Sequence, residues 1–121
     1  MQDEERLENL GLQAQAEKAR KDHLHLQQRA IEALKGLLAR TLNEDLPVIS
    51  WAIHSDPASE ALTGTCDADD RDQRRRDFEA WSEALNATPL PAETTSQGVT
   101  TVRAAVTDNY LELRISLVAD I

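Results

Sequence analysis

Apolar residues recur at helical spacing through the first third of the chain, and no proline interrupts them between residue 3 and Leu42. Ala, Leu, Gln, Glu, Lys and Arg dominate this stretch, and all six favour helix. The pattern therefore predicts one long helix over residues 1–43, with a break expected, if anywhere, near Gly11. Its main apolar stripe consists of Leu24, Ile31, Leu34, Leu38 and Leu42, and four further residues widen it: Leu26, Ala30, Ala33 and Leu37.

The width of this stripe, and its weakness towards the N-terminus, leave open what covers it. A seven-residue repeat places Glu17, Lys21, Gln28 and Lys35 in the seam, which makes a poor coiled coil. A face this broad is nevertheless too apolar to leave in water. Packing on its own domain, pairing with a second copy and binding of another protein all stay open. We take the five residues of the main stripe as candidate partner-binding residues: Leu24, Ile31, Leu34, Leu38 and Leu42.

The pattern changes from helical to alternating after Pro47, whose ring ends the helix. Ile49, Trp51 and Ile53 alternate with smaller or polar residues, which predicts a strand. Residues 55–59 have the composition of a turn, and residues 60–66 alternate more weakly. We favour a return strand there, and hence a hairpin, with a short helix over residues 57–62 as the alternative.

A second helix is expected to begin in the charged stretch CDADDRDQRRRDFEAW, residues 66–81. Asp69 or Asp70 is a suitable N-cap, and acidic residues in the first turn of a helix are stabilising. Residues four apart predict ion pairs on the outer face, namely Asp70 with Arg74, Asp72 with Arg76, and Arg75 with Glu79. The stripe that we expect to be buried consists of Phe78, Trp81, Ala84 and Leu85. Residues 86–98, which contain two prolines, are expected to form a loop.

The C-terminal segment has the clearest strand pattern. Residues 98–106 and 110–121 flank Thr107, Asp108 and Asn109, and Asp and Asn tolerate the positive φ that a tight hairpin needs. Every second residue from Leu111 to Ile121 is apolar and the residues between are mostly polar, which predicts a strand with one wet side. The predicted fold class is α+β, with a long N-terminal helix followed by a β-β-α-β-β antiparallel sheet that carries one helix on its apolar face.

Charge divides the chain at the end of the predicted first helix. Residues 1–43 hold seven acidic and seven basic residues, so the whole net charge of −9 belongs to residues 44–121. We therefore expect an N-terminal helix for assembly or partner binding (1–43) and a small acidic α+β domain (44–121). An acidic surface repels phosphates, which argues against direct binding of nucleic acid.

The sequence also indicates the cellular compartment and the kind of source genome. No apolar run approaches the roughly 20 residues of a membrane span, so we expect no membrane association. The acidic N-terminus is unlike a signal peptide, and a single cysteine agrees with a reducing compartment, so we expect a cytoplasmic protein. The excess of Arg over Lys is typical of a GC-rich bacterial or phage genome.

The charged stretch is the first candidate for chemistry. Counted from Asp67, the EF-hand calcium pattern fails at Arg71, Asp72 and Phe78, where it needs an oxygen ligand, a glycine and a glutamate. Arginines 74–76 fan over most of a helical turn and are flanked by aspartates, which is typical of a solvated surface and not of a phosphate site. We therefore expect no metal site here.

Cysteine and histidine offer the other candidates. Cys66 and His54 would lie near one another across the predicted hairpin, but no third group that could orient them can be named. His23 and His25 are two residues apart and face different directions on a helix, whereas helical metal ligands are three or four apart. We expect no catalytic residue, no cofactor and no enzyme activity.

The sequence thus favours a small soluble non-enzymatic module for protein–protein interaction or regulation, which binds a protein partner, a second copy as a homodimer, or both. Two alternatives stay open. An acidic domain can imitate the phosphates of a nucleic acid and inhibit a DNA- or RNA-binding protein. A concave pocket near Trp51, His54 and Trp81 would instead indicate a small-ligand-binding domain.

Overall fold

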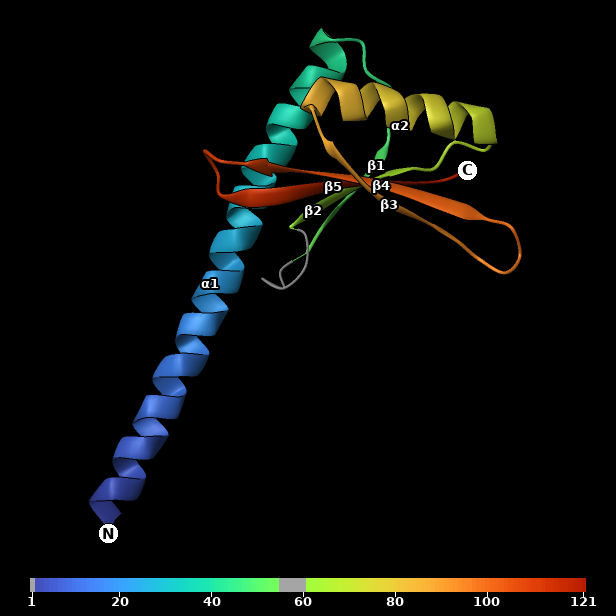
Figure 1. Ribbon diagram of the computed structural model, residues 1–121. Coiled ribbons are helices and arrows are strands. Elements are labelled where there is room, and N and C mark those ends of the chain that lie inside the picture. The colour runs from blue at the N-terminus through green and yellow to red at the C-terminus, as the bar shows by residue number, and fades with distance from the viewer. Residues whose placement is uncertain (1, 55–60) are drawn as a thin grey trace.

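The structure is a computed structural model that describes the backbone of residues 2–54 and 61–121, and side chains from residue 11 onward within those ranges. Two helices and a five-stranded sheet form an α+β fold (Figure 1). The helices are α1 (Gln2–Asn43) and α2 (Arg71–Leu85), and the strands are β1 (Ser50–Ile53), β2 (Leu62–Cys66), β3 (Thr88–Thr94), β4 (Thr100–Asp108) and β5 (Leu113–Asp120).

The sheet is mixed and has the strand order β1-β2-β5-β4-β3. β1 and β2 are antiparallel, as are β3, β4 and β5 in succession, whereas β5 lies parallel to β2. The predicted α+β class and the helix on the apolar face are confirmed. The predicted purely antiparallel, four-stranded sheet is wrong, because the most apolar strand, β5, takes the buried centre of the sheet beside β2, and β3 adds a fifth strand.

Strand β3 occupies the segment that was expected to be a loop. It pairs with β4 at the sheet edge, with Thr88 opposite Ala105 and Leu90 opposite Arg103, and its register shifts after Leu90. All its residues except Leu90 are exposed, so no alternating apolar signal marks it. Its two prolines are compatible with this position because an edge strand needs only half of its N–H groups for pairing.

The first hairpin is confirmed as far as the structure describes it. Ile53 lies opposite Leu62, and the His54 N–H donates to the Ala61 carbonyl at 2.9 Å. Residues 62–66 are strand, which excludes the helical alternative for Leu62. The expected turn over residues 55–59 lies outside the described residues.

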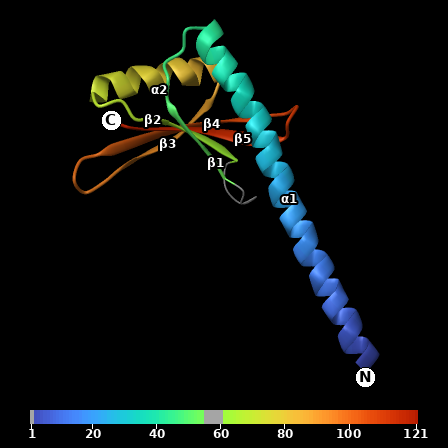
Figure 2. The same cartoon turned by 180° about the vertical axis from the view of Figure 1, so that it is seen from behind.

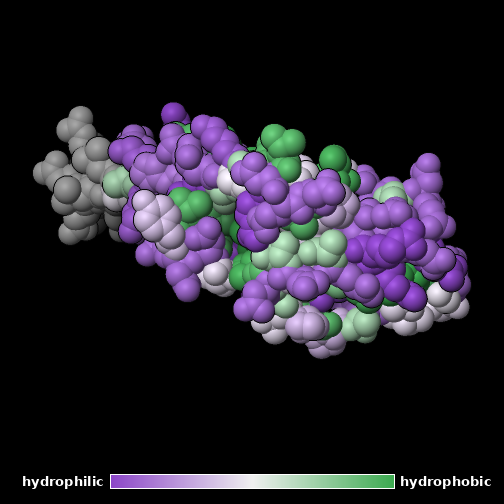
Figure 3. Space-filling view, turned by 90° about the horizontal axis from the view of Figure 1, so that it is seen from above, coloured by the Kyte–Doolittle hydropathy of each residue, from purple (hydrophilic) through white to green (hydrophobic). Residues whose placement is uncertain are grey.

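The core lies between α2 and one face of the sheet. Figure 1 shows α2 across this face, where Leu113, Ile115, Leu117 and Ala119 of β5 are buried as the alternation predicts. Trp81 of α2 is fully buried, and Phe78 and Leu85 pack against the same cluster. Figure 3 looks down on α2 and shows a mostly hydrophilic surface with small, separated hydrophobic patches.

The opposite face of the sheet is less wet than predicted. Ser116 points to this face and is buried, because Thr63 of β2 and Ala105 of β4 flank it in the middle of the sheet. Arg114, two residues earlier on the same face, is exposed. Alternation identifies the two faces of a strand, but the neighbouring strands decide how much water reaches the second face.

Helix α2 begins at the predicted cap. Asp70 has extended backbone angles, and its carboxylate accepts a hydrogen bond from the Gln73 N–H at 3.0 Å. None of the three predicted ion pairs is formed, namely Asp70 with Arg74, Asp72 with Arg76 and Arg75 with Glu79. Arg76 instead donates to the side-chain oxygen of Gln73 at 2.8 Å. The helix builds its charged face through hydrogen bonds more than through ion pairs.

The turn between β4 and β5 differs in detail from the prediction. Positive φ occurs at Glu112 (54°), not at Asp108 or Asn109. The Asp108 carboxylate accepts hydrogen bonds from the N–H groups of Tyr110 and Leu111, each at 3.0 Å. This turn is longer than a two-residue hairpin, and the aspartate closes it with its side chain.

Helix α1 runs unbroken through Gly11 to Asn43, a length of about 63 Å at 1.5 Å per residue. Its C-terminal half packs against the domain, and its N-terminal half extends away from the domain in both views (Figures 1 and 2). Within the described part of the chain, no helix combines the length and apolar character that a bilayer crossing requires.

Candidate interaction surface on the N-terminal helix

Helix α1 carries two apolar rows on different sides. The first row is buried against the domain and consists of Leu26, Ala30, Ala33 and Leu37. The second row, here called the outer row, is exposed and consists of Leu24 (51% exposed), Ile31 (45%), Leu38 (53%) and Leu42 (85%). At 100° per residue the two rows lie about 130° apart around the helix axis. The outer row therefore points away from the domain that the first row covers.

The structure divides the predicted stripe between these two rows. Four of the five candidate residues form the outer row, and the fifth, Leu34, is partly buried and packs against the domain core. The residues that were predicted only to widen the stripe make the domain contact. The spacing showed that α1 has more apolar surface than one contact needs. Which part the domain covers depends on where the sheet lies.

The side chain of Arg40 links the end of α1 to α2 and to the turn that follows α1. The Arg40 Nη2 donates to the Ala84 carbonyl of α2 at 2.6 Å, and its Nε donates to the Glu44 carboxylate at 2.5 Å. This hydrogen bond from Arg40 holds the pKa of Glu44 below its ordinary value, and it raises the pKa of Arg40. Together with the packing of the buried row against the domain, the hydrogen bond to Ala84 joins the C-terminal end of α1 to α2.

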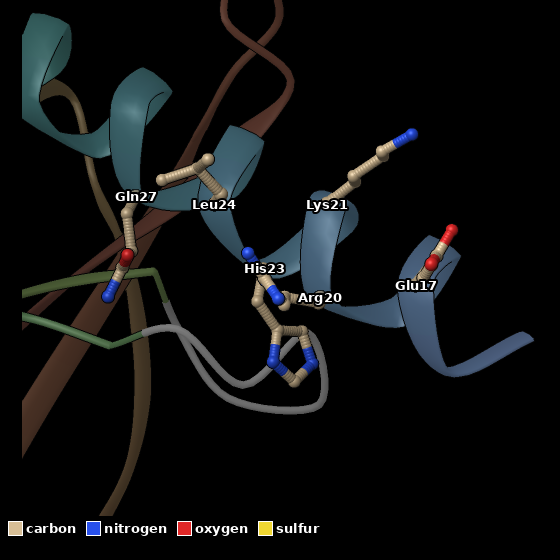
Figure 4. Close-up of a pocket in the computed structure, with 6 residues that line it drawn as sticks. All are labelled: Glu17, Arg20, Lys21, His23, Leu24 and Gln27. Atoms are coloured by element: carbon tan, nitrogen blue, oxygen red, sulfur yellow. The ribbon is translucent and has the colours of Figure 1, made fainter. Parts of the chain in front are cut away.

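The exposed N-terminal part of α1 is polar. Every residue from Gly11 to His25 is exposed. A shallow hollow beside it is lined by Glu17, Arg20, Lys21, His23, Leu24 and Gln27. Figure 4 shows that these side chains come from successive turns of one helix and spread apart, with Lys21 and Leu24 on one side and His23 and Gln27 on the other. They do not converge on a common point, so this hollow is not built as a ligand site.

A second groove of about 440 Å³ lies between α1, the end of α2 and the hairpin of β4 and β5. Its walls are mostly apolar and include Ala33, Gly36, Leu37, Leu85, Val106, Leu111 and Ile115, with Glu32, Arg40 and Asp108 also among its lining residues. Arg40 is already engaged by Glu44 and Ala84. A cofactor site needs several polar groups directed at one ligand. Two of the three charged groups that line this groove, Arg40 and Asp108, are already hydrogen-bonded to other protein groups.

The predicted proximity of Cys66 and His54 is wrong. His54 pairs with Ala61 at one end of β2, and Cys66 ends the same strand five residues later, about 16 Å away at 3.3 Å per residue. Cys66 is buried, and burial together with the charges of Asp77 and Asp67 raises the pKa of its thiol to about 12. This thiol remains protonated and makes a poor nucleophile.

The charged stretch before α2 is held together by Arg74. Its guanidinium donates to the backbone carbonyls of Ala68 (2.7 Å), Asp69 (3.0 Å) and Asp120 (2.7 Å). The carbonyls of Ala68 and Asp69, which lie in the stretch compared with a calcium loop, are therefore already hydrogen-bonded to a cationic side chain. Among the side chains that the structure describes, in residues 11–54 and 61–121, no three from His, Cys, Asp or Glu are grouped so that they could hold a metal.

The proposed small-ligand site around the tryptophans does not converge either. Trp81 is fully buried and packs on Trp51, whereas His54 follows the last residue of β1, three residues after Trp51, and alternation places it on the opposite face. On that opposite face a small hollow of about 260 Å³ is lined by Thr63, Leu90, Arg103, Ser116, Leu117 and Val118. Its Ser116 hydroxyl is buried without a hydrogen-bond partner among the described residues.

Comparison with known proteins adds no relative: the chain matches no protein-family model, no curated protein and no solved structure.

Proposed function

We propose that this protein is a small non-enzymatic interaction module, and that the outer row of α1 is its docking surface. The observation that carries this proposal is the exposure of four large apolar side chains along one side of a helix whose other apolar row is already buried in the domain. The domain completes its core without them. A separate role is therefore the best explanation for their spacing and chemistry.

The form of the surface favours a helix as the group that docks. The outer row runs from Leu24 to Leu42, about 27 Å along the helix, and is one side chain wide. Apolar side chains that recur at seven- and four-residue intervals match the ridges of a second helix. A compact ligand would cover only one or two of them.

The position of α1 supports the same role. The residues before Leu24 project beyond the domain (Figures 1 and 2), so a partner can approach the helix from several directions. The bond from Arg40 to the Ala84 carbonyl anchors the C-terminal end of α1. An anchored helix with a projecting end presents its side chains in a defined orientation, which lowers the entropic cost of binding.

Acidic substitutions in the outer row test this proposal. Tagged full-length chain is compared with Ile31→Glu and Leu38→Glu for retention of the proteins, including untagged copies of itself, that co-purify from the source cells. We expect at least a tenfold loss of retained protein in both variants, because a charge in an apolar contact is costly to desolvate.

The matched control is His25→Glu. His25 is exposed on α1 about a third of a turn from both apolar rows, so the same acidic residue there should leave retention unchanged. Equal retention by all three variants would overturn the proposed role of the outer row.

A further inference from the structure

We propose that the groove between α1, the end of α2 and the β4–β5 hairpin binds a small neutral apolar molecule, and that Gly36 leaves the space for it. The groove has a volume of about 440 Å³, which lies within the range of small-molecule sites. This site is separate from the proposed docking surface, because Gly36 lies about 135° from the centre of the outer row around the axis of α1.

The apolar core of the domain stays open at this corner. Leu85 of α2, Val106 of β4 and Leu111 of the following turn pack against the core but are only partly buried. All three line the groove, and the buried side chains of Leu37 and Ile115 line it as well. Figure 1 shows the end of α2 and the β4–β5 hairpin meeting beside α1. Apolar side chains from three parts of the chain therefore face one space that no described side chain fills.

Gly36 is placed where a side chain would enter this space. It lines the groove, and a Cβ built on it would have no atom within 4 Å. Neither a close neighbour nor a positive φ therefore requires glycine here. Glycine in the middle of a helix is less stable than alanine. The open groove is the structural result of this less favourable residue, and binding of a ligand gives that result a use.

The charges around the groove favour a neutral occupant. Its three charged lining residues already have partners within the protein: Arg40 donates to Glu44, Asp108 accepts from two N–H groups of its own turn, and Glu32 lies 3.3 Å from Lys35. A charged ligand would lose its water here without gaining a free opposite charge, which is costly. An apolar ligand needs only the apolar walls.

The dimensions of the groove favour a small molecule over a docked helix. Its lining residues on α1 run from Glu32 to Arg40, about 12 Å along the helix. The outer row, by comparison, runs for about 27 Å. Three elements bound the groove, so it is a hollow at a corner of the domain, which suits a compact ligand.

A neutral fluorescent probe tests the site in the full-length chain. N-phenyl-1-naphthylamine is uncharged and fluoresces more strongly in apolar surroundings, and it is titrated into the natural chain and Gly36→Leu. We expect saturable binding by the natural chain. The affinity of Gly36→Leu should be lower by about tenfold or more, because the new side chain fills the groove and burial of a leucine-sized group is worth about that factor. Gly36→Ala should bind with intermediate affinity although its unfolding midpoint rises, which separates weaker binding from loss of the fold.

Gly11→Leu is the matched control, since a Cβ on this helical glycine also has no atom within 4 Å and the residue lies in the exposed part of α1. It should bind the probe as the natural chain does, and so should Ile31→Glu. Equal affinity in Gly36→Leu and the natural chain, or no saturable binding up to the solubility limit of the probe, would overturn the ligand site. Loss of a co-purifying protein in Gly36→Leu without any binding of the probe would also overturn it, and would assign the groove to a side chain of a partner. The outer row is tested separately, by the retention of partners in Ile31→Glu and Leu38→Glu.

Discussion

The indole of Trp81 meets the indole of Trp51 edge to face, with ring centroids 5.3 Å apart and planes at 83°. The Nε1 of Trp81 donates to the Pro47 carbonyl at 2.7 Å. Through these two contacts one side chain of α2 is joined to β1 and to the connection that follows α1. The point where the two helices and the first hairpin meet is therefore built around Trp81.

Replacing Trp81 should test this role directly. Trp81→Ala leaves a large cavity and an unpaired carbonyl at Pro47, so we expect the free energy of unfolding to fall by about 3 kcal/mol or more. Denaturant unfolding followed by circular dichroism measures it. Trp81→Phe keeps most of the apolar volume and should cost less. A loss below about 1 kcal/mol for Trp81→Ala would contradict a central place for this ring.

Gly64 allows the ring of Trp51 to lie over β2. A Cβ at this position would come within 2.7 Å of the Trp51 ring and 2.8 Å of Ile49. We expect Gly64→Ala to lower the stability by about 1–3 kcal/mol, because both neighbours belong to the packed core and cannot withdraw. The measurement is the midpoint of denaturant unfolding.

Gly36 provides the matched control for this overpacking. A Cβ on this helical glycine would have no atom within 4 Å. The same substitution, Gly36→Ala, should therefore raise the stability by about 0.5–1 kcal/mol, since alanine favours helix over glycine. If both variants shifted stability in the same direction, the space around each glycine would not explain the effect of the added Cβ.

The thiol of Cys66 should be inert in the folded protein. Burial raises its pKa from 9.0 to about 12, so almost no thiolate exists at pH 8. We expect a thiol reagent such as Ellman's to react slowly with the native chain and rapidly in denaturant. The raised pKa also contributes stability that is full below pH 9 and is lost as pH rises towards 12, because only the unfolded state ionises in that interval. Fast labelling of the native chain would show that the core opens at β2.

The Glu44 and Arg40 pair should make stability weakly dependent on acid. The hydrogen bond from Arg40 lowers the pKa of Glu44 from its ordinary value of 4.5. Its contribution is therefore present above pH 4.5 and is lost as pH falls through the lower folded-state pKa. Unfolding midpoints of the natural chain and Glu44→Gln should differ at pH 7 and converge once the pH falls below the lowered pKa of Glu44. The difference should be small because the pair is exposed. A constant difference across this range would exclude the ionised carboxylate as its cause.

The elements with strong local signals were predictable from the chain alone. Asp70 caps α2 because a carboxylate that follows a turn can accept the first N–H groups of a helix whatever lies nearby. The alternation from Leu113 to Ala119 predicted the buried side of β5, because apolar side chains on a strand must share a face. Strand β3 carries no such signal, since its side chains are exposed and only its backbone pairs with β4.

The sequence by itself determined the types of the elements other than β3, the buried faces of α2 and β5, and the excess of apolar surface on α1, because each of these depends on residues close together in the chain. The tertiary structure decided which of these elements and residues lie side by side. It placed β5 parallel to β2, separated Cys66 from His54, and divided the apolar stripe of α1 into a row that the domain covers and a row that it leaves exposed. These outcomes depend on which distant surfaces bury the most apolar area together. The local sequence does not encode which surfaces these are, because a leucine of the buried row and a leucine of the outer row have similar neighbours along the chain.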